Sequence, residues 1–156
     1  MTDRQGTIKV LFKKLSPGAK IPTSIGEGNV GFDVYCDEEV AIPSMRTKKI
    51  SSGIQLADAS SQDIAGNSIF LKIEGRSGLA ARGVFPIGGI VDISYRGTLG
   101  IMLANMSDVT VIFKPGDRIA QLVVYKVGCS PEVLMAETDV VAETTRGSAG
   151  FGSSGA

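Results

Sequence analysis

Residues 109–125 read Val-Thr-Val-Ile-Phe-Lys-Pro-Gly-Asp-Arg-Ile-Ala-Gln-Leu-Val-Val-Tyr, and this stretch decides the fold class. Val109, Val111 and Phe113 recur at every second position, which is the period of a strand with one buried face. Residues 114–117 contain the turn-forming pair Pro-Gly, and residues 119–125 form a short, nearly continuous apolar run typical of a buried strand. The stretch therefore predicts two β-strands joined by a tight turn.

The same patterns recur outward from this stretch. Alternating or buried apolar runs lie at residues 8–12, 69–73 and 99–103, and turns containing Gly or Pro separate them. Residues 77–82 are the one segment that favours a short helical turn. Many short strands with Gly and Pro between them indicate an all-β protein, built as a sandwich, a jelly roll or a closed barrel.

The chain has 156 residues, 43% hydrophobic and 21% charged, so we expect one globular domain with a substantial core. Its 16 basic and 16 acidic residues cancel, which argues against a protein that coats nucleic acid. We expect no membrane span, because no apolar run reaches about 18 residues, and lysines near the N-terminus argue against a signal peptide. Cys36 and Cys129 form no close pair and suit a reducing compartment, cytoplasmic or nuclear.

The sequence contains no histidine. This absence excludes Ser-His-Asp and Cys-His nucleophiles, zinc sites of the HExxH type and any imidazole base. Acid–base chemistry would therefore have to come from a carboxylate, a lysine, a tyrosine or a metal.

The pentapeptide Gly75-Arg-Ser-Gly-Leu79 is a candidate phosphate-binding segment. An arginine and a hydroxyl flank a glycine, and backbone N–H groups are free at the start of the possible helical turn. The alternative is a simple junction between a strand and a turn.

The run Gly88-Gly-Ile-Val-Asp-Ile-Ser-Tyr-Arg-Gly97 places the carboxylate of Asp92 among apolar residues. A carboxylate is costly there unless it is paired or used, so Asp92 is the best candidate for a base that orients water. The alternative is a capping residue in a hairpin turn. Tyr95 is either a stacking surface or an ordinary hairpin aromatic.

Two further polar residues interrupt apolar strands. Gln121 needs a hydrogen-bond partner, which is either a ligand oxygen or a neighbouring strand. Asp33 lies in the short segment Gly31-Phe-Asp-Val34 and is either an outer ligand of a metal or a residue that faces solvent.

The last twenty residues, 137–156, contain few core-forming side chains and end in a sequence rich in Gly and Ser. One interpretation is a frayed terminus. Arg146 and Phe151 favour another, because a cation and an aromatic ring among glycines can fold over a ligand and clamp it.

Taken together, five segments occur in an order and spacing that resemble the five motifs of the trimeric dUTPase family. The resemblance runs from about residue 8 to the C-terminus, and the third and fifth segments are the most specific. The segments are Gly31-Phe-Asp-Val, Arg76-Ser-Gly-Leu-Ala, Gly89-Ile-Val-Asp-Ile-Ser-Tyr-Arg-Gly, Gly116-Asp-Arg-Ile-Ala-Gln-Leu and Arg146-Gly-Ser-Ala-Gly-Phe-Gly-Ser-Ser-Gly.

The resemblance implies an all-β, jelly-roll-like distorted β-barrel of the dUTPase β-clip type that assembles as a homotrimer. It implies a single domain over residues 1–136 and a flexible arm over residues 137–156 that closes the active site of a neighbouring subunit. The implied reaction is a Mg²⁺-assisted attack of water on the α-phosphate of dUTP, which yields dUMP and pyrophosphate. The implied partners are dUTP and further copies of the chain, with no nucleic acid and no membrane.

The resemblance also assigns roles by motif position. Asp92 would orient the attacking water, Tyr95 would pack under the deoxyribose, and Asp33 would contact magnesium through water. Arg146 would meet the terminal phosphate, and Phe151 would stack on the uracil. The remaining implied contacts are Gly89, Ile90, Val91 and Gly100 at the uracil edge, Arg76, Ser77, Gly78 and Gln121 at the phosphates, and Gly152 and Ser153 in the arm.

Four positions depart from the usual pattern of the family, and none is in the implied chemistry. Many members have Pro, Asp, Glu and Thr where this chain has Gly75, Ser94, Thr98 and Ser154. A dCTP deaminase on the same fold is an alternative, although such enzymes usually lack the arm motif. A non-catalytic nucleotide-binding or signalling trimer is a second alternative, and a structural jelly-roll protein of the capsid type is a third.

Overall fold

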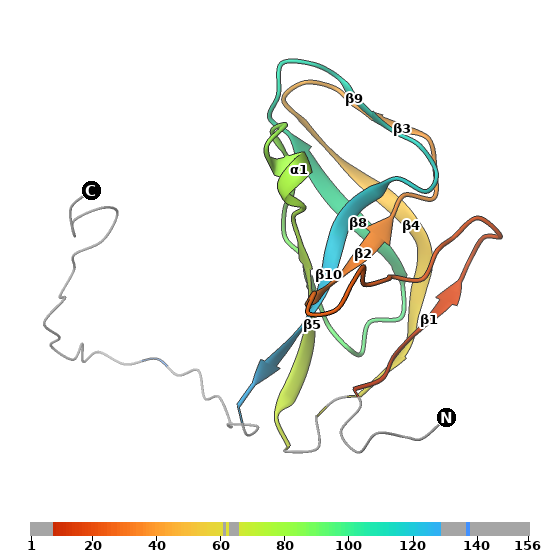
Figure 1. Ribbon diagram of the computed structural model, residues 1–156, viewed down its shortest axis with the longest axis vertical. Helices are drawn as coiled ribbons and strands as arrows, with labels where there is room; N and C mark the ends of the chain where they lie inside the picture. The colour runs from red at the N-terminus through yellow and green to blue at the C-terminus, as the bar shows by residue number, and fades with distance from the viewer. Residues whose placement is uncertain (1–7, 61, 63–65, 129–136, 138–156) are drawn as a thin grey trace, which may run out of the picture.

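The computed structural model describes residues 8–60, 62, 66–128 and 137, and this part of the chain is almost entirely β-structure (Figure 1). The prediction of an all-β fold is confirmed, and the predicted helical turn is present as α1 (Ser77–Ala80). The strands are β1 (Val10–Lys14), β2 (Gly31–Tyr35), β3 (Val40–Ile42), β4 (Arg46–Ala59), β5 (Ser68–Glu74), β6 (Val84–Pro86), β7 (Ile90–Val91), β8 (Thr98–Asn105), β9 (Val111–Phe113) and β10 (Arg118–Val127).

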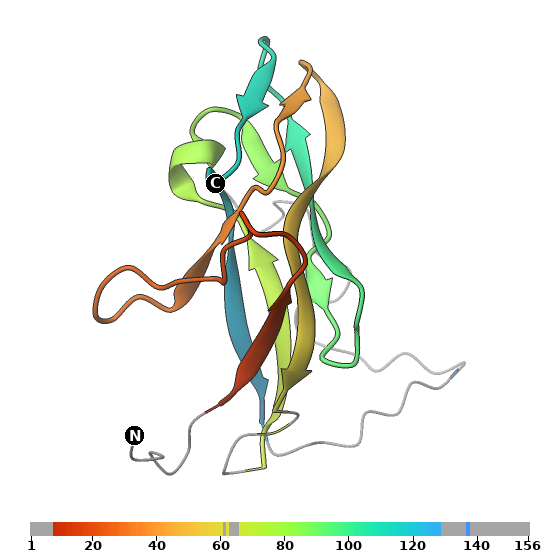
Figure 2. The same ribbon diagram turned by 90° about the vertical axis from the view of Figure 1, so that its right-hand side faces the viewer.

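The described strands form two four-stranded sheets and one small ribbon. The first sheet has the order β1-β4-β8-β6, the second has the order β2-β10-β5-β7, and β3 pairs with β9. All of these pairs are antiparallel. The two larger sheets lie as separate layers and, within the described residues, do not close into a barrel, so the fold is jelly-roll-like and open (Figure 2).

The core fills the space between the two layers. In β5 every second residue is buried, and Ile69, Leu71 and Ile73 point inward as the alternation predicts. Leu71 and Ile73 belong to one continuous cluster with side chains from the other sheet, among them Ile50 of β4 and Ile101 of β8. This packing provides most of the hydrophobic stabilisation. It also determines which face of each strand lies outside the core.

The longest strand, β4, was not predicted from the sequence. Its first four residues, Arg-Thr-Lys-Lys, are exposed, and its pairing with β8 shifts register between Ser51 and Gln55. Gly53 lies inside this irregularity with a φ of +65°. Because the bulge interrupts the period of two, simple alternation does not reveal the strand.

The strand predicted from Val109 onward begins only at Val111, so this boundary was wrong. Val109 is 59% exposed. Its carbonyl oxygen accepts hydrogen bonds from Asn105 Nδ2 at 2.8 Å and from Ser107 Oγ at 3.1 Å. The backbone at Val109 therefore closes the turn before β9 and does not pair with a neighbouring strand.

Asn105 is a fully buried polar residue at the end of β8. Its Nδ2 also donates to the carbonyl of Ile42 at 2.9 Å, and its Oδ1 accepts from the backbone N–H of Ser107 at 3.0 Å. The side chain thus ties β8 to β3 and to the turn that leads to β9.

Cys36 is a buried free thiol at the end of β2, and burial raises its pKa. Cys129 lies outside the described residues. Within the described part of the chain, no helix has the length and apolar character needed to span a membrane.

We expect Asn105→Ala to lower the free energy of unfolding by about 2–4 kcal/mol, because it removes the side-chain donor from the carbonyl oxygen of buried Ile42 and also breaks the hydrogen bonds to Val109 and Ser107. Urea unfolding at a fixed protein concentration measures the change. Thr110→Ala, an exposed change in the same turn, is the control and should stay within about 0.5 kcal/mol. Equal stability of the two variants would contradict the structural role of Asn105.

Candidate active site

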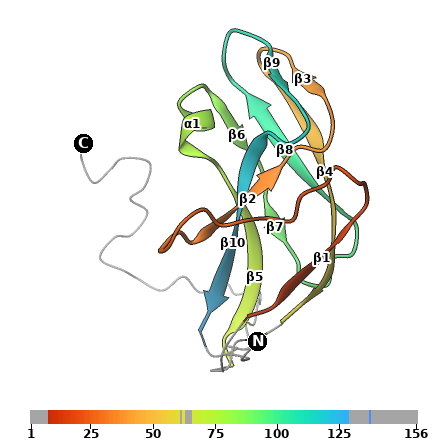
Figure 3. The same ribbon diagram turned by 45° about the vertical axis from the view of Figure 1, so that its right-hand side comes forward.

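The pairing of β10 with both of its neighbours brings three of the five segments together. Gln121 of β10 lies opposite Asp33 of β2 and opposite Glu74 of β5. Arg76 and α1 follow directly after β5, at the end of the sandwich where β10 begins (Figure 3). Residues far apart in the sequence therefore meet on the outward face of the second sheet.

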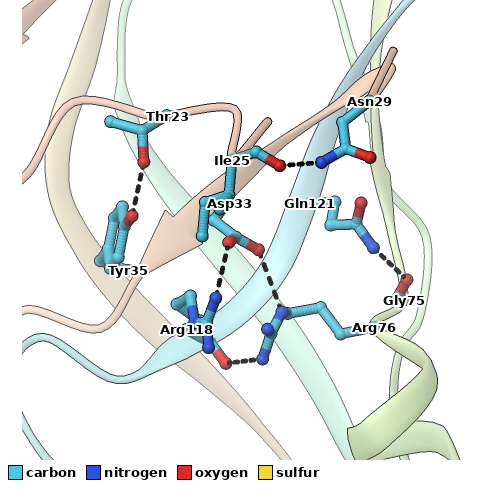
Figure 4. Close-up of polar contacts among 9 residues, drawn as sticks. All are labelled: Thr23, Ile25, Asn29, Asp33, Tyr35, Gly75, Arg76, Arg118 and Gln121. Atoms are coloured by element: carbon cyan, nitrogen blue, oxygen red, sulfur yellow. Dashed lines mark hydrogen bonds and ion pairs between the residues drawn. The ribbon is translucent and has the colours of Figure 1, made fainter. Parts of the chain in front are cut away.

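Asp33 holds two arginines in place (Figure 4). Its Oδ1 lies 3.0 Å from Arg76 Nε and its Oδ2 lies 3.3 Å from Arg118 Nη1. The Asp33 side chain is only 12% exposed, and Arg76 Nη1 also donates to the carbonyl oxygen of Arg118 at 3.2 Å. The sequence had named Asp33 and Arg76 as candidates but not Arg118, although Arg118 lies within the fourth quoted segment.

Gln121 is fixed by its neighbours on both sides. Its Nε2 donates to the carbonyl oxygen of Gly75 at 3.2 Å, so the partner required by this polar residue is on an adjacent segment. Its side chain also crosses Gly31, where a Cβ atom would lie 2.1 Å from Gln121 Oε1. Glycine at position 31 therefore leaves the room that the Gln121 side chain occupies.

These residues line a cavity of about 530 Å³, called the cationic cavity below because Arg76 and Arg118 are in its lining. Ser77 and Gly78 contribute to its wall, as the sequence predicted. The loop before β2, which projects from both sheets (Figure 2), contributes four residues that the sequence did not single out. The complete lining is Ile25, Gly28, Asn29, Val30, Gly31, Asp33, Arg76, Ser77, Gly78, Arg118 and Gln121.

This loop has its own internal contacts. Asn29 Nδ2 donates to the carbonyl oxygen of Ile25 across the loop, and the hydroxyls of Thr23 and Tyr35 lie 2.6 Å apart at its base (Figure 4). The cavity thus has two cationic side chains and one amide on one side and a hydrogen-bonded loop on the other. Such a lining suits an anionic ligand.

Residues 88–100, called the hairpin below, link β7 of the second sheet to β8 of the first, although these two strands do not pair with each other. They line a second, separate set of cavities. Gly89 has a φ of +113°, and a Cβ there would lie 2.7 Å from the carbonyl oxygen of Ile73, so only glycine fits. Its own carbonyl oxygen accepts from the N–H of Ile73 at 2.8 Å and holds the hairpin on β5. Ile90, Val91 and Gly100 line the two adjoining spaces, of about 210 Å³ and 150 Å³.

Tyr95 lies folded over its own hairpin. Its hydroxyl donates to the carbonyl oxygen of Thr98 at 3.1 Å, and a Cβ at Gly97 would lie 2.2 Å from that hydroxyl. The side chain is 45% exposed and lines the larger hairpin cavity. It therefore presents a ring to this cavity in a fixed orientation.

Asp92 is exposed and lines neither the cationic cavity nor the hairpin cavities. The expectation that its carboxylate is costly within an apolar run was wrong, because Asp92 lies past the end of β7, at the start of a turn in which its side chain is exposed, while Val91 is buried. Its carboxylate has no partner among the described residues. It is therefore available to a ligand that reaches this edge of the hairpin.

One set of ionic contacts lies beside the cationic cavity. Glu74 Oε1 lies 2.6 Å from Lys72 Nζ and accepts from the Tyr125 hydroxyl at 2.9 Å. The hydrogen bond to Glu74 raises the pKa of Lys72 and of Tyr125, and the hydrogen bond from Lys72 lowers the pKa of Glu74. The three groups therefore keep their ordinary charges at neutral pH.

One chain does not bring all candidate residues together. The cationic cavity and the hairpin cavities share no lining residue among those described. Arg146, Phe151, Gly152 and Ser153 lie outside the described residues. The chain is thus an all-β protein that carries a cavity lined by two arginines and a separate, largely neutral hairpin cavity.

A profile of the dUTPase family matches residues 18–155. The deoxyuridine 5'-triphosphate nucleotidohydrolase of Paramecium bursaria Chlorella virus 1 is 35% identical over 147 residues, covering 94% of this chain and 97% of the viral protein. The dUTPase of Staphylococcus bacteriophage 80alpha, solved with dUPNHPP, has a TM-score of 0.74 at 24% identity and covers 95% of this chain and 99% of its own. A point mutant of the dUTPase from phage phi11 of S. aureus, whose structure reveals the coordination of a structural Mg(II) ion, has a TM-score of 0.69 at 19% identity and covers 83% of this chain and 97% of its own. The chain therefore belongs to the dUTPase family.

We expect Gly31→Ala to lower the affinity for inorganic pyrophosphate by about tenfold, the effect of losing one hydrogen bond. The new Cβ would displace the Gln121 side chain from its contact with Gly75. Isothermal titration measures the affinity. Gly18→Ala is the matched control, because a Cβ there meets nothing closer than 3.7 Å. Unchanged affinity in both variants would show that the orientation of Gln121 does not matter for anion binding.

Proposed function

We propose that this chain hydrolyses dUTP to dUMP and pyrophosphate with Mg²⁺, in a homotrimer whose active sites lie between subunits. The observation that carries the proposal is the presence, on one dUTPase-family chain, of two complementary cavities. One is cationic and contains Arg76, and the other is a largely neutral hairpin that contains Tyr95. In such a trimer, the cationic cavity of one chain faces the hairpin of another. The reaction would limit the incorporation of uracil into DNA and supply dUMP for dTMP synthesis.

The cationic cavity holds the phosphates. Arg76 offers the guanidinium donors that Asp33 leaves free, Gln121 offers its amide, and Ser77 and Gly78 complete the wall. Arg118, paired to the same carboxylate, adds a second cation. Preorganised donors of this kind stabilise the charge that develops when a phosphate is transferred.

Magnesium fits this cavity through Asp33 and water. The described residues contain no group of three or more Asp, Glu or Cys side chains that would cage a metal. Mg²⁺ keeps several waters and binds through one or two carboxylates together with substrate phosphates, and Asp33 is such a carboxylate in the lining of the cavity. Asp33 would hold the ion through water, and the ion would supply neutralisation of the phosphate charge.

The hairpin cavity holds the nucleoside. The main chain of Gly89, Ile90 and Val91, together with Gly100, provides the donors and acceptors that read the edge of uracil. Tyr95 packs under the deoxyribose with the ring orientation that Gly97 allows. A site built on fixed backbone groups rejects a base whose edge leaves these groups unpaired.

Asp92 orients the water that attacks the α-phosphate. Its exposed, unpaired carboxylate follows directly after Val91, which lines both hairpin cavities. A carboxylate base is sufficient for this role, so the lack of histidine is no obstacle.

The arm over residues 137–156 closes the site of a neighbouring subunit. Arg146 meets the terminal phosphate, Phe151 stacks on the uracil, and Gly152 and Ser153 lie against the substrate. Closure excludes water during the reaction, and opening releases the products. The protein acts in a reducing compartment, cytoplasmic or nuclear.

The test of the proposed function is pyrophosphate release from dUTP, dCTP, dTTP and UTP with Mg²⁺. We expect turnover of dUTP alone, with discrimination against dCTP of about 10⁴–10⁵ in kcat/KM. Release of ammonia from dCTP would instead indicate a deaminase, and binding of dUTP without turnover would indicate a nucleotide-responsive regulatory protein.

We expect Asp92→Asn to lower kcat for dUTP by about 10²–10⁴-fold, because the amide cannot accept the proton of the attacking water. Binding of dUTP should persist, since the cavities remain intact. Stopped-flow pyrophosphate release and equilibrium binding separate the two effects. Asp108→Asn is the control, because Asp108 is an exposed carboxylate that lines none of the cavities. Near-normal turnover of the Asp92 variant would rule out the water-orienting role.

A further inference from the structure

We infer that Lys49 is a further base-binding residue, whose ammonium group donates a hydrogen bond to a carbonyl oxygen of the uracil. The inference rests on the proposed function, because it assigns a partner to a side chain of the proposed nucleoside cavity. Lys49 is in the exposed first half of β4, the strand that was not predicted, and its role was likewise not visible from the sequence.

The position of Lys49 is fixed by the absence of a side chain at Gly100. In the ladder between β4 and β8, Lys49 lies opposite Met102, and Ser51 lies opposite Gly100. A Cβ at Gly100 would meet Lys49 Cε at 2.3 Å, Cγ at 3.1 Å and Cδ at 3.2 Å. The lysine stem therefore leans along the strand and occupies the room above Gly100.

The surroundings of Lys49 leave its charge unmatched. It lines the larger hairpin cavity together with Ile90, Val91, Tyr95, Thr98, Leu99 and Gly100, none of which is charged. The adjoining smaller cavity has no charged residue in its described lining either. Among the described residues Lys49 has no hydrogen bond or ion pair, whereas Lys72 on the other sheet is paired with Glu74.

The chemistry of an ammonium group narrows the choice of ligand atom. It offers three donors and no acceptor, so it can bind carbonyl oxygens but not the N3–H of uracil. The phosphates have their own donors in the cationic cavity, which shares no residue with the hairpin cavity of the same chain. Because the stem crosses Gly100, which is at the proposed uracil edge, the base oxygens are the acceptors nearest to Lys49.

The test combines Lys49→Met, which keeps the stem and removes the charge, with sulfur substitution of either base oxygen. The substrates are dUTP, 2-thio-dUTP and 4-thio-dUTP, and the readout is kcat/KM of the full-length protein. We expect Lys49→Met to lower kcat/KM for dUTP by about 10- to 100-fold, the usual effect of a charged hydrogen bond.

The decisive quantity is the coupling between the two changes. For one of the two thio-substrates, kcat/KM of the protein with Lys49 should be lower than for dUTP. The same sulfur atom should have little further effect on kcat/KM of the Lys49→Met variant, because the hydrogen bond is already lost. Lys48→Met is the matched control. This neighbouring exposed lysine lines none of these cavities, and its loss should leave all three substrates unaffected.

Three results would overturn the inference while leaving dUTP hydrolysis intact. The first is unchanged kcat/KM of Lys49→Met for dUTP. The second is a higher kcat/KM, which would identify the Lys49 side chain as an obstruction. The third is an equal loss of kcat/KM for all three substrates, which would place the ammonium group on the sugar or the phosphates. If the unsubstituted protein fails to hydrolyse dUTP, the proposed function fails and Lys49 loses its assigned ligand with it.

Discussion

The register of β10 between β2 and β5 is the constraint on which the cationic cavity depends. It sets Gln121 beside Asp33 on one side and Glu74 on the other, while Leu122 points into the core. A slip of one residue would exchange the inward and outward faces of β10 and bury the amide in place of the leucine. The apolar contacts that stabilise the sandwich are therefore the same contacts that hold Asp33 and Gln121 side by side on the outward face.

Local patterns in the sequence reveal the strands better than they reveal the partners of a site. The alternation at residues 69–73 predicts β5 and its buried face, and the isolated polarity of Gln121 correctly signals a need for a partner. Asp33, however, pairs with Arg76 and Arg118, which lie 43 and 85 residues away. Only the strand order brings these three together, and no spacing along the chain encodes that order.

Asp92 shows why an apolar neighbourhood in sequence differs from one in space. The desolvation argument assumed that the carboxylate shares the surroundings of Val91, which is buried. The strand β7 ends at Val91, and Asp92 begins a turn in which its carbonyl oxygen accepts from the N–H of Tyr95 at 2.9 Å. The turn directs the carboxylate to solvent, so an apolar neighbour in the sequence does not imply an apolar environment for the side chain.

The high glycine content has a related explanation in the structure. At Gly31, Gly97 and Gly100 the room of the missing Cβ is filled by the side chains of Gln121, Tyr95 and Lys49, respectively, and none of the three glycines has a positive φ. At these positions glycine is therefore needed for the space that it leaves to a neighbouring side chain, and not for its backbone conformational freedom. Each glycine leaves room for one particular side chain, and hydrogen bonds then hold Gln121 and Tyr95 in that room before a ligand arrives, which reduces the entropy lost on binding.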